Sequence, residues 1–231
     1  MSDILKNHKK KSDEILLKIK PLQFFNEYLR HGYYPFFTEG IARFPYRLEE
    51  VVNMILEIEL PLLRSVEPAY ILKIKQLLQI VAESVPFIPN IDGLSKRIKI
   101  HRNTLISYLN YLQETRLINH LHKDISGINR LQKPEKIYLE NPNLAYTLAE
   151  KNADIGNIRE TFFLNQMSYN HIVEYPNSGD FWVDKQFLFE IGGKNKSGKQ
   201  IKEAGNAYIV ADNIEYGFDK KIPLWLFGML Y

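Results

Sequence analysis

Apolar residues recur at helical spacing through the first third of the chain, and this pattern predicts a run of amphipathic helices. We expect these helices over residues 12–20, 24–31, 47–60 and 68–84. Pro21 is expected to separate the first two, because proline lacks the amide hydrogen that a helix interior needs. Pro86 and Pro89 then indicate a module boundary.

The middle of the chain combines short helices with short strands. A helix is predicted over residues 92–98, a turn over 99–101 and a longer helix over 102–117. Two alternating strands, 118–122 and 136–140, follow around a polar loop. This order of helix, tight turn, helix and strand pair is typical of a winged helix-turn-helix.

The last third predicts an α/β domain with a mixed central sheet. A helix over 158–169 precedes three strands, near residues 172–175, 181–183 and 187–191. A further helix is expected from Lys199. The apolar run 223–231 is continuous, as in a strand that is buried on both faces, so it is expected to be the final strand.

The amino-acid composition excludes several classes of protein and of site. The chain has 231 residues, of which 45% are hydrophobic and 25% charged, and its formal net charge is +3. Any basic surface must therefore be local. The absence of cysteine excludes disulfides, thiolate zinc sites and cysteine nucleophiles. No apolar run approaches the roughly 20 residues of a membrane span, and the N-terminus does not look like a secretion signal, so we expect a cytoplasmic protein without a membrane partner.

One pair of carboxylates is placed together by hairpin geometry. A tight turn centred on Lys185 would make Asp180 and Glu190 cross-strand neighbours, with Cβ atoms about 5 Å apart. Two such carboxylates repel each other unless a cation or a proton lies between them. The pattern therefore predicts a site for a hard metal ion such as Mg²⁺, or the remnant of one.

Several short motifs occur in one succession along nearly the whole chain. The most specific are Arg159-Glu160-Thr161-Phe162-Phe163, Gly179-Asp180-Phe181 and Phe189-Glu190-Ile191-Gly192-Gly193-Lys194. Others lie in 27–35, 94–95, 104–109, 133–138 and 223–228. Together they resemble the C-terminal part of a large group of prokaryotic AAA-type ATPases, which carries a winged helix and a PD-(D/E)xK-nuclease-like domain of unknown function.

The resemblance implies three domains in an α+β and α/β architecture. Residues 1–88 would be the helical lid remnant of the ATPase, 89–142 the winged helix, and 143–231 the nuclease-like domain. ATP would be bound only in an upstream domain that this chain lacks, so no ATP hydrolysis and no cofactor-binding residue are expected here. The upstream ATPase domain or its oligomer would be a partner.

The resemblance also assigns roles to the acidic residues. Glu160, Asp180 and Glu190 would hold Mg²⁺, and a lysine would orient the attacking water. Gly192 stands where the family has this lysine, so Lys194 is the candidate to replace it. Two interpretations stay open: a metal-dependent DNA nuclease, in which Asp180, Glu190 and Lys194 are catalytic, and inherited acids without activity.

A dense basic cluster surrounds the start of the second predicted winged-helix helix. Such positions contact bases and phosphates in DNA-binding relatives of this fold. The candidate nucleic-acid-binding residues are Lys96, Arg97, Lys99, Arg102, Asn103 and Thr104. DNA binding, packing against a neighbouring domain, and a purely structural assembly role all remain open.

Three further patterns favour ordinary structure over chemistry. Gly193 to Gln200 has phosphate-loop spacing, but Gln200 replaces the hydroxyl residue that binds Mg²⁺, so a basic turn is predicted. His120 and His122 share one face of a strand without a third ligand nearby and are expected to be wing residues. Trp182 is expected in the core.

Overall fold

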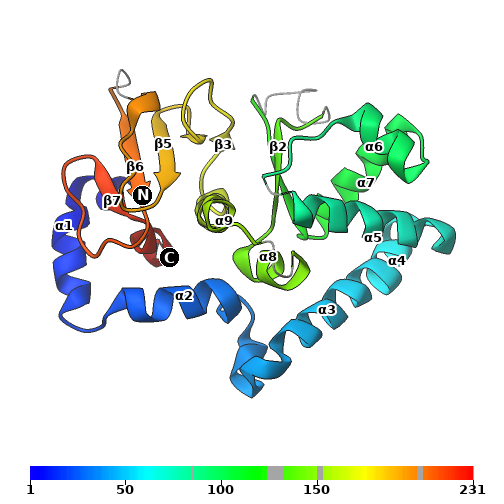
Figure 1. The fold of residues 1–231 in the computed structure, drawn as a ribbon, viewed down its shortest axis with the longest axis horizontal. Helices are drawn as coiled ribbons and strands as arrows, with labels where there is room; N and C mark the ends of the chain where they lie inside the picture. The colour runs from blue at the N-terminus through cyan, green and yellow to red at the C-terminus, as the bar shows by residue number, and fades with distance from the viewer. Residues whose placement is uncertain (85, 124–132, 150–152, 202–204, 231) are drawn as a thin grey trace. The chain divides into compact units, whose positions relative to one another are not determined.

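The computed structural model describes residues 1–84, 86–123, 133–149, 153–201 and 205–230, and of Gln200 only the backbone. The chain combines helices with sheets of mixed strand order, which confirms a mixed α+β class (Figure 1). It divides into two compact units. Unit 1 joins residues 1–30 to 155–231, and unit 2 comprises 31–154. These units cut across the three domains expected at 1–88, 89–142 and 143–231.

Unit 1 is built on one five-stranded sheet of order β3-β4-β5-β6-β7. β3 to β5 pair antiparallel, whereas β5, β6 and β7 pair parallel, so the predicted mixed sheet is confirmed. The expected strands near 172–175, 181–183 and 187–191 are present, and β6 was not predicted. The strands are β3 (Val173–Glu174), β4 (Phe181–Val183), β5 (Phe187–Gly192), β6 (Ala207–Ala211) and β7 (Lys221–Pro223).

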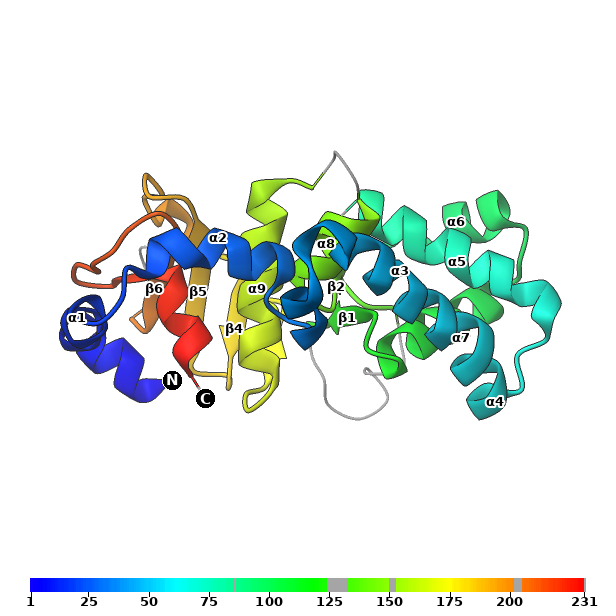
Figure 2. The ribbon, with the colours of Figure 1, turned by 90° about the horizontal axis from the view of Figure 1, so that it is seen from below.

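A phenylalanine cluster joins this sheet to helix α9 (Ile155–Ser168), which packs on β5 (Figure 2). The ring of Phe163 lies 5.4 Å from that of Phe181, and 5.0 Å from those of Phe189 and Phe227. Such spacings are those of favourable aromatic pairs. The cluster is fully buried and forms the centre of the unit 1 core.

The N-terminal helices belong to the same unit as the sheet. α1 (Ser2–Leu16) contacts β7 and the C-terminal 3₁₀ helix, and α2 (Pro21–His31) places Phe25 at 5.0 Å from Phe162. The first helix therefore starts ten residues before the predicted Ser12 and ends at Leu16, and Pro21, expected between the two helices, is the first residue of the second. These contacts explain why residues 1–30 do not group with the rest of the expected lid segment.

The prediction of a final strand over 223–231 was wrong beyond Pro223. Leu224–Met229 forms a 3₁₀ helix, η7, in which Leu224, Trp225, Leu226 and Phe227 are buried. A continuous apolar run indicates that a segment is buried, but it does not distinguish a strand from a helix. The helix expected from Lys199 is a single 3₁₀ turn, η6 (Lys199–Ile201).

Unit 2 begins with a long helical stretch. Two 3₁₀ turns, η1 (Pro35–Glu39) and η2 (Ile41–Arg43), lead into α3 (Phe44–Met54), a π turn η3 (Ile55–Glu59) and α4 (Leu60–Arg64) without a break. Pro61 lies two residues after Glu59, the last residue of the π turn. Because proline has no amide hydrogen and its ring crowds the preceding turn, the π turn is the expected accommodation.

The remainder of unit 2 is a three-helix group with a hairpin. α5 (Pro68–Glu83), α6 (Ile91–Ile98) and α7 (Arg102–Glu114) are followed by the antiparallel strands β1 (Ile118–Leu121) and β2 (Lys136–Leu139). These elements match the predicted ones closely. The loop predicted between 122 and 136 lies largely outside the described residues.

Phe87 extends the hairpin by an isolated antiparallel β-bridge, in the position of a third strand. Its backbone exchanges two hydrogen bonds with Ile137 of β2, at 2.9 and 2.8 Å. The element order is therefore helix, strand position, helix, helix and hairpin. Leu77 and Val81 of α5 and Leu105 and Leu109 of α7 are among the residues that form the core of this group.

Two buried asparagines close unit 2. Asn141 caps α8 (Pro142–Leu148) by accepting a hydrogen bond from the Leu144 amide at 3.2 Å, and it donates to the Tyr34 hydroxyl at 2.9 Å. Asn143 accepts from the Tyr33 amide at 3.0 Å. The aromatic connector at 33–37 is thus fixed by residues more than a hundred positions later. Of the helices that the structure describes, none is long and apolar enough to cross a membrane.

Candidate functional site

The hairpin that carries Asp180 and Glu190 has the predicted register. Phe181 pairs with Phe189 and Val183 with Phe187, so the pairing is centred on Lys185. Asp184 and Lys185 both adopt a φ of about 54°, the left-handed backbone that a tight turn requires. The tight hairpin on which the predicted pairing of Asp180 and Glu190 depends is therefore present.

The Asp180 carboxylate is engaged with the backbone of β5. Its Oδ2 accepts a hydrogen bond from the Ile191 amide at 2.6 Å, and the Asp180 amide donates to the Phe189 carbonyl at 2.8 Å. β4 begins only at Phe181. The carboxylate of Asp180 therefore accepts the hydrogen bond of the Ile191 amide that a backbone carbonyl would accept if β4 continued. Gly179, with φ +82°, makes this close approach, since a Cβ there would lie 3.1 Å from the Phe189 oxygen.

A lysine already neutralises Glu190, and it is not the predicted one. The Lys196 Nζ lies 3.1 Å from Oε1 of Glu190, whose residue is only 2% exposed. The stem of Lys196 crosses Gly192, where a Cβ would meet the Lys196 Cδ at 2.7 Å. Glycine at position 192 therefore leaves room for the side chain of Lys196. This explains why position 192 holds a glycine and not the lysine of the family.

Lys194, predicted to be catalytic, is exposed instead. Its carbonyl accepts a hydrogen bond from the Lys221 ammonium, which also donates to the Lys196 carbonyl at 3.3 Å. No contact joins its side chain to Asp180 or Glu190 among the contacts that the structure describes. Lys221 thus holds the loop in the conformation that directs Lys196 to Glu190.

The predicted metal site is not formed by these residues. Glu160 lies half-buried on α9. Within the described ranges, no three histidine, aspartate or glutamate side chains are close enough together to bind a metal ion. Asp180 bonds to a backbone amide and Glu190 to an ammonium group, so the arrangement does not fit Mg²⁺. The second carboxylate oxygen of Glu190 is buried without a hydrogen-bond partner in the described part of the chain.

A second buried ion pair lies at the carboxyl end of β6, and sequence reasoning missed it. Arg159 Nε is 2.8 Å from Asp212 Oδ2, and both side chains are largely buried. The Asp212 amide donates to the Gly192 carbonyl at 2.8 Å, which places the pair beside the end of β5. The available signal was the run Ala207–Ala211 followed by an aspartate, since parallel strands gather polar residues at their carboxyl ends.

The basic cluster of unit 2 surrounds the turn between α6 and α7. α6 is capped by Asn90 and ends at Ile98, and the φ of 58° at the next residue, Lys99, allows the sharp turn into α7. Lys96, Arg97 and Lys99 are exposed, and none of them makes an ion pair with a described residue. Their charges are therefore available to an anionic partner.

The other three residues predicted to contact nucleic acid differ in how exposed and how free of ion pairs their side chains are. Arg102 pairs with Asp92 at 2.9 Å, although its side chain remains 56% exposed. Asn103 is exposed and Thr104 is half-buried. The opposite end of α7 is occupied within unit 2, because Arg64 of α4 pairs with Glu114 at 2.6 Å. The N-terminal end of α7 is consequently the accessible one.

The remaining motifs do not form ligand sites. The loop after Gly193 leads into a three-residue 3₁₀ turn, so it lacks the helix that a phosphate loop needs. The rings of His120 and His122 lie 5.7 Å apart. Burial, and then the neighbouring His122, lower the pKa of His120 to about 3, so it is neutral at physiological pH.

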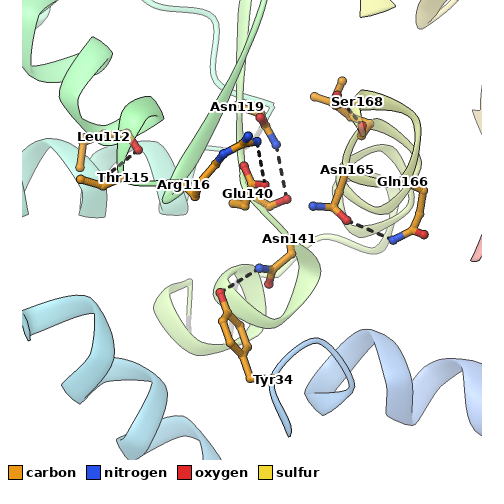
Figure 3. Close-up of polar contacts among 11 residues, drawn as sticks. Tyr34, Leu112, Thr115, Arg116, Asn119, Glu140, Asn141, Asn165, Gln166 and Ser168 are labelled. Atoms are coloured by element: carbon orange, nitrogen blue, oxygen red, sulfur yellow. Dashed lines mark hydrogen bonds and ion pairs between the residues drawn. The ribbon is translucent and has the colours of Figure 1, made fainter. Parts of the chain in front are cut away.

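One buried carboxyl group in unit 2 has a strongly altered pKa. Glu140 follows β2, and burial raises its pKa to about 7 despite the opposing effects of Arg116 and Asn119. Figure 3 shows both of these side chains directed at Glu140. Arg116 Nη1 lies 3.7 Å from the carboxylate, and Asn119 donates to the Glu140 carbonyl at 3.4 Å.

Residues 22–155, more than half of the chain, match the family described as a domain of unknown function (DUF8612). The chain belongs to this family. Comparison with curated proteins and with solved structures found no match. The DUF8612 match runs from α2 to the first residue of α9, so it includes the basic cluster, the hairpin of unit 2 and Glu140. The acidic residues of the β3–β7 sheet lie beyond it.

Proposed function

We propose that the winged helix expected over residues 89–142 binds duplex DNA through the start of α7 and the turn before it. The observation that carries the proposal is the exposed group Lys96, Arg97 and Lys99, which has no anionic partner among the described residues. Lysine and arginine side chains of this kind neutralise phosphates and release counterions, which is the main source of affinity for DNA.

The order of elements supports the same proposal. A helix, a strand position at Phe87, two helices joined by a tight turn, and an antiparallel hairpin follow one another as in winged helices. In that fold the second helix of the pair enters the major groove with its N-terminal residues. Here this helix is α7, and Arg102 and Asn103 are its exposed first residues.

Replacement of Arg97 by alanine is expected to weaken duplex binding by roughly threefold to tenfold, because one phosphate contact is lost. The slope of log affinity against log salt should become shallower by about 0.9. Fluorescence anisotropy with a labelled duplex at several salt concentrations measures both quantities. Arg102→Ala should have a smaller effect, since Asp92 already offsets its charge.

Lys9→Ala provides the matched control, because Lys9 is an exposed cation of unit 1 and the change in net charge is the same. Equal losses for Arg97→Ala and Lys9→Ala would mean that only overall charge matters. Flat titrations of the wild type together with a stable oligomer would replace the proposal by an assembly role.

For the chain as a whole, we propose a role as the C-terminal portion of an AAA-type ATP-binding protein. The support is the resemblance of its motifs, from the Tyr33-Tyr34-Pro35 connector to the Phe189-Glu190-Ile191 strand. In this arrangement nucleotide would be bound upstream, and unit 2 would deliver DNA to the ATPase. The strands and α9 of unit 1 would be its PD-(D/E)xK-nuclease-like domain.

The alternative function is a metal-dependent DNA nuclease, and the observation in its favour is the hairpin register, which is centred on Lys185 and brings Asp180 to the backbone of β5, the strand that carries Glu190. The ion pair between Glu190 and Lys196 opposes it. We expect no Mg²⁺- or Mn²⁺-dependent cleavage of supercoiled plasmid by the purified chain, and no difference from Asp180→Asn. Cleavage that needs divalent metal and disappears in Asp180→Asn would establish the nuclease instead.

A further inference from the structure

The sequence suggested that Trp182 lies in the core. In the structure it does not. Its neighbours Phe181 and Val183 are fully buried, and Phe181 packs on Phe163 of α9, whereas Trp182 points to the other face of β4 and is 37% exposed. It lines an open cavity of about 510 Å³ together with Leu188 and the loops that flank the two strands. This volume is within the range of cavities that hold small molecules.

Three primary amides also line this cavity. They belong to Asn177, Gln186 and Asn206, and none of their side chains makes a hydrogen bond to a described residue. A primary amide offers both donors and an acceptor. Trp182 therefore supplies an aromatic face, and the amides supply neutral hydrogen-bonding groups beside it. This combination suits a flat ligand with donors and acceptors on its edge.

A cation is bonded to one of the residues that line the same cavity. Gly205 lines the cavity, and its carbonyl accepts a hydrogen bond from the Lys220 ammonium at 2.7 Å. Lys220 is exposed, so its charge is accessible to an anionic group of a ligand that enters here. A neutral sugar would not use this charge, whereas a nucleotide places a phosphate next to its base.

We propose that this cavity binds an unpaired nucleobase of a single-stranded nucleic acid. The base stacks on Trp182, the amides of Asn177, Gln186 and Asn206 bond to its edge, and Lys220 attracts the adjoining phosphate. Stacking on an aromatic side chain is the usual source of affinity for single strands. The proposal rests on the proposed function only in taking nucleic acid as the ligand, and it uses a different unit of the chain.

Tryptophan fluorescence tests the proposal directly, because the chain has only two tryptophans. Trp225 is 2% exposed, its Nε1 donates to the Ile214 carbonyl, and it does not line this cavity, so a ligand bound here contacts only Trp182. Titration of the full chain with oligo(dT) should quench the emission. Trp182→Ala should abolish the quenching and weaken oligo(dT) binding by about tenfold or more, whereas Trp225→Phe should retain both. Tyr216→Ala, which removes another exposed aromatic ring of unit 1, is the matched control for binding.

The outcomes separate this site from the duplex site of unit 2. Arg97→Ala should leave the quenching by oligo(dT) unchanged. If duplex binding depends on Arg97 but oligo(dT) does not quench Trp182, the single-strand site is wrong and the proposed function stands. Quenching by a neutral oligosaccharide but not by oligo(dT) would likewise overturn the nucleobase assignment. Quenching without duplex binding would retain the site and remove the winged-helix function.

Discussion

Substitution of Lys196 by methionine is expected to reduce the free energy of unfolding by about 3 kcal/mol. The change removes the ammonium group but keeps most of the stem that crosses Gly192, so the effect reports the lost charge. Glu190 is then left buried without its counter-ion, and breaking a buried ion pair typically costs about 3–5 kcal/mol. The low end of that range applies because the Lys196 side chain is partly exposed. Urea denaturation at neutral pH measures the difference.

Lys194→Met is the matched control for this substitution. It removes the same charge from the same loop, but Lys194 is exposed and contributes only its carbonyl to the described contacts. We expect a change below about 0.5 kcal/mol, as is usual at exposed positions. A double-mutant cycle with Glu190→Gln should give a coupling energy of about 1–3 kcal/mol. Equal effects of the two lysine substitutions would contradict the assignment of Lys196 as the partner of Glu190.

Substitution of Glu140 by glutamine is expected to stabilise the protein above neutral pH and to leave it nearly unchanged near pH 5. Burial raises the pKa of Glu140 from its usual 4.5 to about 7, so between these values the folded state binds more protons than the unfolded state. Stability must therefore fall as pH rises through this window, by roughly 3 kcal/mol in total. Glutamine is neutral at every pH and removes this loss.

The measurement is the free energy of unfolding of both proteins between pH 4 and 9. Glu135→Gln is the control, because Glu135 is an exposed glutamate shortly before β2. The stability difference between Glu140→Gln and wild type should appear as pH passes 4.5 and level off above about 7. A difference that is independent of pH would show that folding does not raise the pKa of Glu140.

Local geometry made the hairpin of unit 1 predictable. A symmetric turn fixes the partners on both strands, so Lys185 at the centre was enough to pair Phe181 with Phe189 and Val183 with Phe187. The helices and hairpin around α6 and α7 followed in the same way from short-range periodicity and turn residues. Each of these elements is defined by neighbours within a few residues, which sequence patterns record well.

The chemistry around the hairpin depended on longer-range contacts and was predicted less well. Alternation placed Lys194 on the face of Glu190, yet the chain turns after Gly193 and Lys196 reaches back instead. Asp212 joins Arg159 only because β6 lies beside β5 in the sheet. Trp182 was expected in the core, but alternation along β4 directs it away from the face on which Phe181 meets Phe163. A pattern gives the face of a strand and does not say what covers that face.

The π turn between α3 and α4 limits how this part of the DUF8612 family can vary in length. One residue more or less in a continuous helix rotates everything after it by roughly 100°. Such a rotation would carry Arg64 away from Glu114 and from the ring of Tyr111, which its guanidinium approaches to 5.8 Å. Relatives that lack a residue between Ile55 and Glu59 should therefore also lack this attachment of α4 to the C-terminal end of α7. Proline at position 61 and the extra residue in the turn are expected to be gained or lost together.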